Sequence, residues 1–321
     1  MSANKKIEEG LEHIKSAEKC LKTSLLKWRP DFDEAADEYN KAATCFRIAK
    51  SFEQCRDCLL KASNCHKQNK NGFYAAKALD QAILVCKELS DLGNVASMAK
   101  QAANLYQTGG NAESASSSLE KAAKILEQKH LKDALSLFQQ AAEISIIQDS
   151  TRQAAEYMSK VARIHVKLQE YDLAADAIRR EMGLHQQSEA YQAIGRLAVA
   201  LVLVQLARGD VVAAEKAFKE WGNCCEAPEV QCLESLLTAY DEEDRDQAKR
   251  ALGNPFIKFM DIEYAILARD MPLPEETRAP VKAPETVNID KEDTSGHEEQ
   301  GDQAAAGEAP IHEDDEEEGI C

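Results

Sequence analysis

The absence of proline over a long central stretch most constrains what this chain can fold into. No proline occurs between Pro30 and Pro228, and because proline disrupts helix interiors, its absence permits long helices. Within this stretch a pattern first seen as FDEAADEYNKAATCF returns every 19 or 20 residues. An internal period of this length indicates stacked structural repeats. The repeat frames start at Phe32, Phe52, Gly72, Leu92, Ala112, Leu131, Thr151 and Tyr171, with weaker echoes at Tyr191 and Asp210.

The order of residue sizes within one frame predicts a helix. In the unit that begins at Ala112, small residues occupy the third and tenth offsets, Ala115 and Ala122, with the bulky Leu119 between them and the apolar Ile125 after them. These offsets follow the helical period and trace one apolar stripe, whose small residues let a neighbouring helix approach closely. A single helix cannot bury its own stripe, whereas stacked neighbours can. We therefore expect an all-α fold, an α-solenoid of antiparallel helical hairpins similar to tetratricopeptide repeats but with longer units.

Four segments follow from the limits of the repeat. A helix from Ile7 to Thr23 is expected before the array, and helices at Pro228 to Tyr240, Arg245 to Leu252 and Pro255 to Arg269 after it. The predicted segments are 1–31, an N-terminal helix and loop; 32–222, the solenoid; 223–270, a C-terminal helical bundle; and 271–321, an acidic tail.

Most of the negative charge lies in the last segment. The chain has a net charge of −17, and residues 271–321 hold 16 Asp and Glu against 3 Lys and Arg. These residues include no aromatic side chain and five of the eight prolines. Such a composition cannot bury enough apolar surface to fold alone, so we expect a disordered tail. The remaining body is nearly balanced in charge, which argues against nucleic acid as a partner.

The chain shows no secretory or membrane-spanning signal. Its N-terminus lacks an apolar segment, and no apolar run approaches the length that spans a bilayer. Ten cysteines without a secretory signal are typical of a reducing compartment. We therefore expect a cytoplasmic protein.

One cysteine cluster raises the question of a zinc site. Cys55, Cys58, Cys65 and His66 lie close together in sequence. However, Cys55 and Cys65 occupy a small and an apolar slot of the repeat, and ligands this far apart on one rigid helix could not all reach one ion. We interpret them as core residues. No nucleotide-binding or hydrolase motif is present, so we expect neither enzymatic activity nor a cofactor, and a metal-dependent enzyme is a remote alternative.

Three features could carry binding, and the first is a set of lysines. The ninth offset of four repeats carries Lys41, Lys61, Lys121 and Lys160. Basic residues in register would form a stripe suited to an acidic, elongated partner. Lysine is also common on exposed faces, where it serves solubility alone.

The second feature is the loop sequence SLLKWRP, and the third is the terminus. Leu25, Leu26 and Trp28 lie among basic residues, which is typical of a membrane-surface contact, although packing into the first hairpin is an equal alternative. At the end of the chain, Ile320 follows the acidic residues Glu316, Glu317 and Glu318. An isolated apolar residue behind an acidic run could be held by a partner.

Three sequence stretches together resemble the soluble NSF-attachment protein family. They are LKWRPDFDEAADEYNKAA, NPFIKFMDIEYAILA and the terminal Gly-Ile-Cys, which points to the gamma branch. The resemblance covers residues from about 5 to 270 and the last few.

The resemblance implies an adaptor that acts in vesicle trafficking and membrane fusion. In that family a sheet of helical hairpins binds the acidic SNARE four-helix bundle, formed by syntaxin-type proteins, through basic residues. The N-terminal loop contacts the membrane, which implies peripheral membrane association. The C-terminal end engages the hexameric ATPase NSF, and a hydrophobic residue one place before the end, here Ile320, helps to stimulate it. The rival interpretation is another tetratricopeptide-like scaffold that binds a peptide or helical partner.

Overall fold

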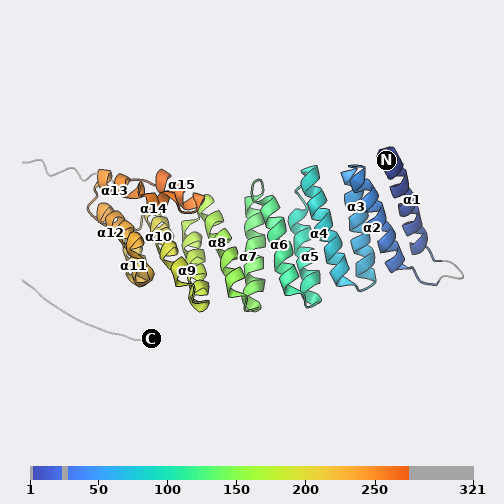
Figure 1. The fold of residues 1–321 in the computed structure, drawn as a ribbon, viewed down its shortest axis with the longest axis horizontal. Coiled ribbons are helices and arrows are strands. Elements are labelled where there is room, and N and C mark those ends of the chain that lie inside the picture. The colour runs from blue at the N-terminus through green and yellow to red at the C-terminus, as the bar shows by residue number, and fades with distance from the viewer. Residues whose placement is uncertain (1–2, 24–27, 275–321) are drawn as a thin grey trace, which may run out of the picture. The chain divides into compact units, whose positions relative to one another are not determined.

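The computed structural model describes residues 3–23 and 28–274, and these residues form helices joined by short turns (Figure 1). No strand occurs within these two ranges. The helices are α1 (Ala3–Leu21), α2 (Phe32–Ile48), α3 (Phe52–Gln68), α4 (Gly72–Leu89), α5 (Val95–Thr108), α6 (Ala112–Leu126), α7 (Leu131–Ile147), α8 (Thr151–Lys167), α9 (Tyr171–Gln187), α10 (Tyr191–Ala207), α11 (Val211–Trp221), the 3-10 helix η1 (Gly222–Cys224), α12 (Ala227–Asp241), α13 (Arg245–Leu252), α14 (Pro255–Lys258) and α15 (Ile262–Asp270).

The repeat frames predicted from the sequence coincide with the helices. Every frame start from Phe32 to Tyr191 is the first residue of a helix, except Leu92. There α5 begins three residues later, at Val95, because Asp91 to Asn94 form a turn in which the Val95 amide donates to the Leu92 carbonyl over 3.2 Å. Residues such as Asp, Gly and Asn favour turns over helix. The all-α solenoid of antiparallel hairpins is therefore confirmed.

The turns explain why the period is twenty. A residue with positive φ recurs at Lys50, Lys70, Ser90, Gly110, Asp149, Gln169, Glu189 and Gly209. At each of these turns the next amide donates back to a carbonyl five residues earlier, as from Ser51 to Phe46 over 2.9 Å. This is the left-handed closure that commonly ends helices. The single step of 19 falls at the turn after α6, where none of residues 127–130 has positive φ.

The small residues of the repeat lie where neighbouring helices meet. Ala115 and Ala122 of α6, and Ala134 and Ala141 of α7, are fully buried. Each helix from α1 to α10 packs against the next, as Figure 1 shows. Alternate helices also touch: α4 contacts α6, and α5 contacts α7. The even-numbered and odd-numbered helices therefore form two rows, which we call the even row and the odd row.

The C-terminal helices follow a different plan. Nearly every residue of α10 from Ile194 to Leu206 is buried, because α9, α11, α12 and α15 all pack against it. The helices expected at Pro228 to Tyr240 and at Arg245 to Leu252 are present as α12 and α13. The single helix expected over Pro255 to Arg269 is instead two, α14 and α15. Residues 259–261 separate them, and Asp261 at the start of α15 has an extended ψ of 142°. This break lets α15 turn onto α8 and α10.

Candidate interaction surfaces

The loop between α1 and α2 ends in an exposed tryptophan. Trp28 is 87% exposed, although its neighbours are fixed: the Asp31 amide donates to the Cys20 carbonyl over 3.1 Å, and the Asp31 side chain caps α2. Trp28 therefore does not pack into the first hairpin in this structure. Leu25 and Leu26 lie outside the described residues. The membrane contact of all three stays a prediction.

The four repeat lysines do not form a single line. Lys41, Lys121 and Lys160 lie on α2, α6 and α8 of the even row, whereas Lys61 lies on α3 of the odd row. Lys61 instead lies over the Tyr39 ring, with its Nζ 5.6 Å from the ring centroid. Sequence offsets alone could not separate the two rows, because consecutive helices share one pattern but alternate between rows.

Each of the three repeat lysines on the even row, Lys41, Lys121 and Lys160, has an acidic neighbour; we call these three the even-row lysines. Lys41 pairs with Glu38 over 2.6 Å and remains largely exposed, and Lys160 pairs with Glu127, the residue that follows α6, over 3.7 Å. Burial raises the pKa of the Asp80 carboxyl on α4, and the nearby Lys121 opposes that rise. An ion pair made by an exposed lysine such as Lys41 contributes little to stability, so its ammonium group can change partners at low cost. Lys160 and Glu127 are both half-buried.

The cysteine cluster is part of the core. Cys55, Cys58 and Cys65 are buried, and burial raises the pKa of the Cys58 thiol to about 11, which disfavours the thiolate that binds metal. Cys55 and Cys58 belong to one hydrophobic cluster and Cys65 to another. Within residues 3–23 and 28–274, no three His, Cys, Asp or Glu side chains gather in a way that could hold a metal ion.

The two repeat histidines are packing residues of the helices that carry them. His66 and His165 occupy the same offset in α3 and α8, and both are buried. The His165 ring nitrogen lies 2.7 Å from a Glu170 carboxylate oxygen, whereas burial lowers the pKa of His66. Among the hydrogen bonds of residues 3–23 and 28–274, none joins either ring to a serine or cysteine side chain.

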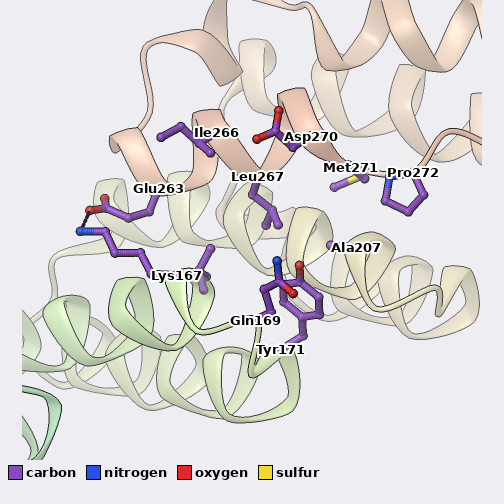
Figure 2. A pocket seen from close by; sticks show the side chains of 11 residues that line it. Lys167, Gln169, Tyr171, Ala207, Glu263, Ile266, Leu267, Asp270, Met271 and Pro272 are labelled. Atoms are coloured by element: carbon purple, nitrogen blue, oxygen red, sulfur yellow. Dashed lines mark ion pairs between the residues drawn. The ribbon is translucent and has the colours of Figure 1, made fainter. Parts of the chain in front are cut away.

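The contact between α8 and α15 was not predicted from the sequence. Arg163 pairs with Asp261 over 2.8 Å and Lys167 with Glu263 over 2.9 Å. Figure 2 shows the second pair beside a hollow of about 280 Å³, into which Leu267 points from α15 toward Tyr171. We call this space, between α15 and the ends of α8 to α10, the seam hollow. No sequence signal joins residues almost 100 positions apart, since neither pair belongs to a repeat.

The predicted NSF contact residues cannot be placed on this surface. Ile320, Glu316, Glu317 and Glu318 lie outside the described residues. As far as the described helices go, none combines the length and the apolar character needed to cross a bilayer.

Comparison with known proteins identifies the family. The family model for "Soluble NSF attachment protein, SNAP" matches residues 8–254. A gamma-soluble NSF attachment protein of Dictyostelium discoideum is 27% identical over 283 residues, covering 87% of each chain. One of Arabidopsis thaliana is 27% identical over 267 residues, covering 82% of this chain and 92% of its own length.

An alpha form extends the comparison beyond the gamma branch. The alpha-soluble NSF attachment protein of Vitis vinifera is 29% identical over 246 residues, covering 74% of this chain and 84% of its own length. The region that the family model matches includes the array from α2 to α9 and continues through α13. The resemblance noted in the sequence is thus confirmed, and the chain belongs to the soluble NSF attachment protein family.

Proposed function

We propose that this protein is a non-enzymatic adaptor that binds assembled SNARE complexes and recruits the ATPase NSF to take them apart. The observation that carries the proposal is the family match, which extends over residues 8–254 and so includes the whole helical array. A long surface of stacked helices suits an elongated helical partner.

The even row supplies the SNARE contact in this proposal. Lys41, Lys121 and Lys160 lie at the same repeat offset on three helices of one row, so we expect their charges to lie along one side of the array. An acidic four-helix bundle would offer its own carboxylates to these ammonium groups, in place of Glu38 at Lys41 and Glu127 at Lys160. Lys61, on the odd row, contributes less.

The loop between α1 and α2 contacts the membrane in this proposal, and the C-terminal residues contact NSF. Trp28, together with Leu25 and Leu26, touches the membrane surface, which makes the protein a peripheral membrane protein in the cytoplasm. Ile320 and the acidic residues Glu316, Glu317 and Glu318 engage NSF, with charge guiding the encounter and the apolar side chain completing it.

A charge reversal at the three even-row lysines tests the adaptor function. The triple change of Lys41, Lys121 and Lys160 to Glu should weaken capture of an assembled SNARE bundle at least tenfold at low salt, because like charges would face each other. Lys61→Glu is the matched control and should change capture much less. Undiminished capture by the triple variant would reject this surface, and failure of the wild-type chain to capture the bundle would favour a peptide-binding scaffold.

A further inference from the structure

A second hollow lies on the other side of α15, enclosed by α13, α14 and α15. It has a volume of about 500 Å³. Its floor is apolar and includes Leu252, Ile257, Ala268 and Met271, all of which are buried. A concave, largely apolar space of this size can receive one or more side chains of a binding partner. We call it the basic-rimmed hollow.

All three charged residues that line this hollow are basic. They are Lys249 of α13, Lys258 of α14 and Arg269 of α15, and each is exposed. Arg269 bonds to Asp270 with distances of 2.7 and 2.8 Å, but Asp270 lines the seam hollow instead. Among the carboxylates of residues 3–23 and 28–274, none pairs with Lys249 or Lys258. An apolar floor therefore lies beneath a rim on which Lys249 and Lys258 have no acidic partner among the described residues, whereas Arg269 is paired with Asp270.

The seam hollow, which shares Ile266 and Met271 with it, has the opposite character. Its lining includes Lys167, Glu263 and Asp270, and Lys167 already pairs with Glu263 over 2.9 Å. Lys167 and Glu263 satisfy one another there, and Asp270 pairs with Arg269 at the rim of the other hollow. Among the described residues no carboxylate pairs with Lys249 or Lys258, so their charge is available to a ligand.

We propose that the basic-rimmed hollow binds an acidic segment of a partner protein that carries one bulky apolar side chain. The carboxylates of that segment pair with Lys249 and Lys258, and the apolar side chain enters the hollow against Leu252 and Ile257. The site goes beyond the proposed SNARE contact, because it is built from α13 to α15 whereas the even-row lysines lie on α2, α6 and α8.

The recessed floor favours a peptide over a bilayer. Leu252 and Ile257 are only 8% and 1% exposed, so a flat membrane surface could not reach them, and Ile266, 43% exposed, is the one large apolar side chain of the lining that protrudes. Membrane contacts instead use protruding apolar side chains. A single side chain on a flexible segment can enter a hollow of this depth while its neighbouring carboxylates remain at the rim.

Peptide binding to the full-length protein tests the proposal. The probe is a fluorescein-labelled peptide, Glu-Glu-Glu-Leu-Glu-Glu-Glu, and binding is followed by fluorescence anisotropy. We expect saturable binding that weakens as salt rises. Lys249→Glu with Lys258→Glu should weaken it about tenfold or more. Lys216→Glu with Lys219→Glu, two exposed changes on α11 that do not line the hollow, should leave it unchanged and control for total charge.

Two further variants test the apolar part of the site. Replacing the central Leu of the peptide by Ser, or Leu273→Ser in the protein, should each weaken binding about tenfold. Ile262→Ser is the matched control, because Ile262 is 67% exposed and does not line the hollow. Circular dichroism and melting temperature establish that each variant remains folded, so a loss of binding reports on the site.

Four results would overturn the proposal, and the last of them concerns vesicles. The first is equal binding by the Lys249 and Lys258 double variant and the wild type, and the second is equal binding of the Leu and Ser peptides. The third uses full-length protein in which the six carboxylates of residues 313–318 become amides. If this change strengthens peptide binding about tenfold and the gain requires Lys249 and Lys258, the chain's own acidic segment is the occupant. Anionic vesicles that bind through these lysines while the peptide does not would assign the surface to membranes.

Discussion

The helices of the array, α2 to α9, bury one stripe each, whereas α10 buries nearly every residue from Ile194 to Leu206. Apart from α8, which also contacts α15, an array helix packs mainly against the helices next to it in sequence, so its stability depends on near neighbours. Helix α10 is instead a hub for α9, α11, α12 and α15. The same chain thus combines a nearly one-dimensional region with a small globular one.

The difference extends to the kinds of contact that hold each region. Small residues at fixed offsets let array helices pack closely, and each repeat uses the same kind of contact. The C-terminal helices share no such pattern. They depend on the apolar α10 and on two ion pairs that fasten α15 to α8, Arg163 with Asp261 and Lys167 with Glu263. A change in the array should therefore act locally, and a change at α10 should act on several helices at once.

The largest expected effect comes from a cavity in the hub. Leu201 of α10 and Leu119 of α6 are both fully buried. Either change to Ala should lower the free energy of unfolding by about 2–5 kcal/mol. Hydrogen exchange should distinguish them: Leu201→Ala should accelerate exchange in α9, α11, α12 and α15, and Leu119→Ala only in α4 to α7. If both variants accelerate exchange in equally many helices, the distinction between a locally packed array and a central α10 is wrong.

A smaller effect is expected from overpacking in the array. Ala122 of α6 is fully buried at a helix contact. Ala122→Leu should lower the free energy of unfolding by about 1–3 kcal/mol, because the neighbouring helix must move away. Lys124→Leu, two positions on and exposed, is the control. An unchanged thermal midpoint for Ala122→Leu would show that the repeat register is wrong.

Alanine substitutions at two glycines compare the backbone of a turn with that of a helix interior. Gly209, in the turn after α10, has a φ of +86°, whereas Gly183 lies within α9, and an added Cβ would meet nothing within 4 Å at either site. Gly209→Ala should therefore cost about 1 kcal/mol through backbone strain. Gly183→Ala should instead raise the free energy of unfolding by about 0.5–1 kcal/mol. Chemical denaturation measures both, and changes of the same sign would exclude backbone conformation as the cause.

The smallest effect concerns Glu181 of α9, at the junction of the two regions. Burial raises the pKa of its carboxyl from the ordinary value of 4.5, although His185 and Arg163 favour the charged form. The folded state therefore holds its proton to higher pH than the unfolded state, and stability falls as pH rises from 4.5 through the folded pKa. Glu181→Gln should be modestly more stable at neutral pH and lose that advantage below 4.5. Melting temperatures across this range check it, and a pH-independent difference would contradict it.

Much of the array could be predicted from the sequence because its information is local. A period of 19 or 20 residues places the start of nearly every array helix, and the size order within a frame identifies residues such as Ala115 and Ala122 as buried contacts. Helix formation and its apolar stripe depend on residues within a few turns of one another. The period does not show which row a helix belongs to. The repeat offset therefore places Lys61 in one set with the three even-row lysines, although it lies on the odd row.

The candidate sites were predicted less completely. The exposed Trp28 and the three even-row lysines could be selected from residue type and spacing, and their roles in binding stay predictions. Leu25, Leu26, Ile320 and Glu316 to Glu318 lie outside the described residues. The basic-rimmed hollow had no sequence signal, because Lys249, Lys258 and Arg269 come from three separate helices.

The helical class, the period and the buried face of each array helix follow from the sequence alone. The arrangement of the C-terminal helices depends on tertiary contacts: the break between α14 and α15, the burial of α10 by its neighbours, and the pairing of Arg163 with Asp261. The physical reason is distance along the chain. Backbone hydrogen bonds and stripes of side chains are set within one helix, whereas contacts between residues almost 100 positions apart depend on how all the helices between them stack.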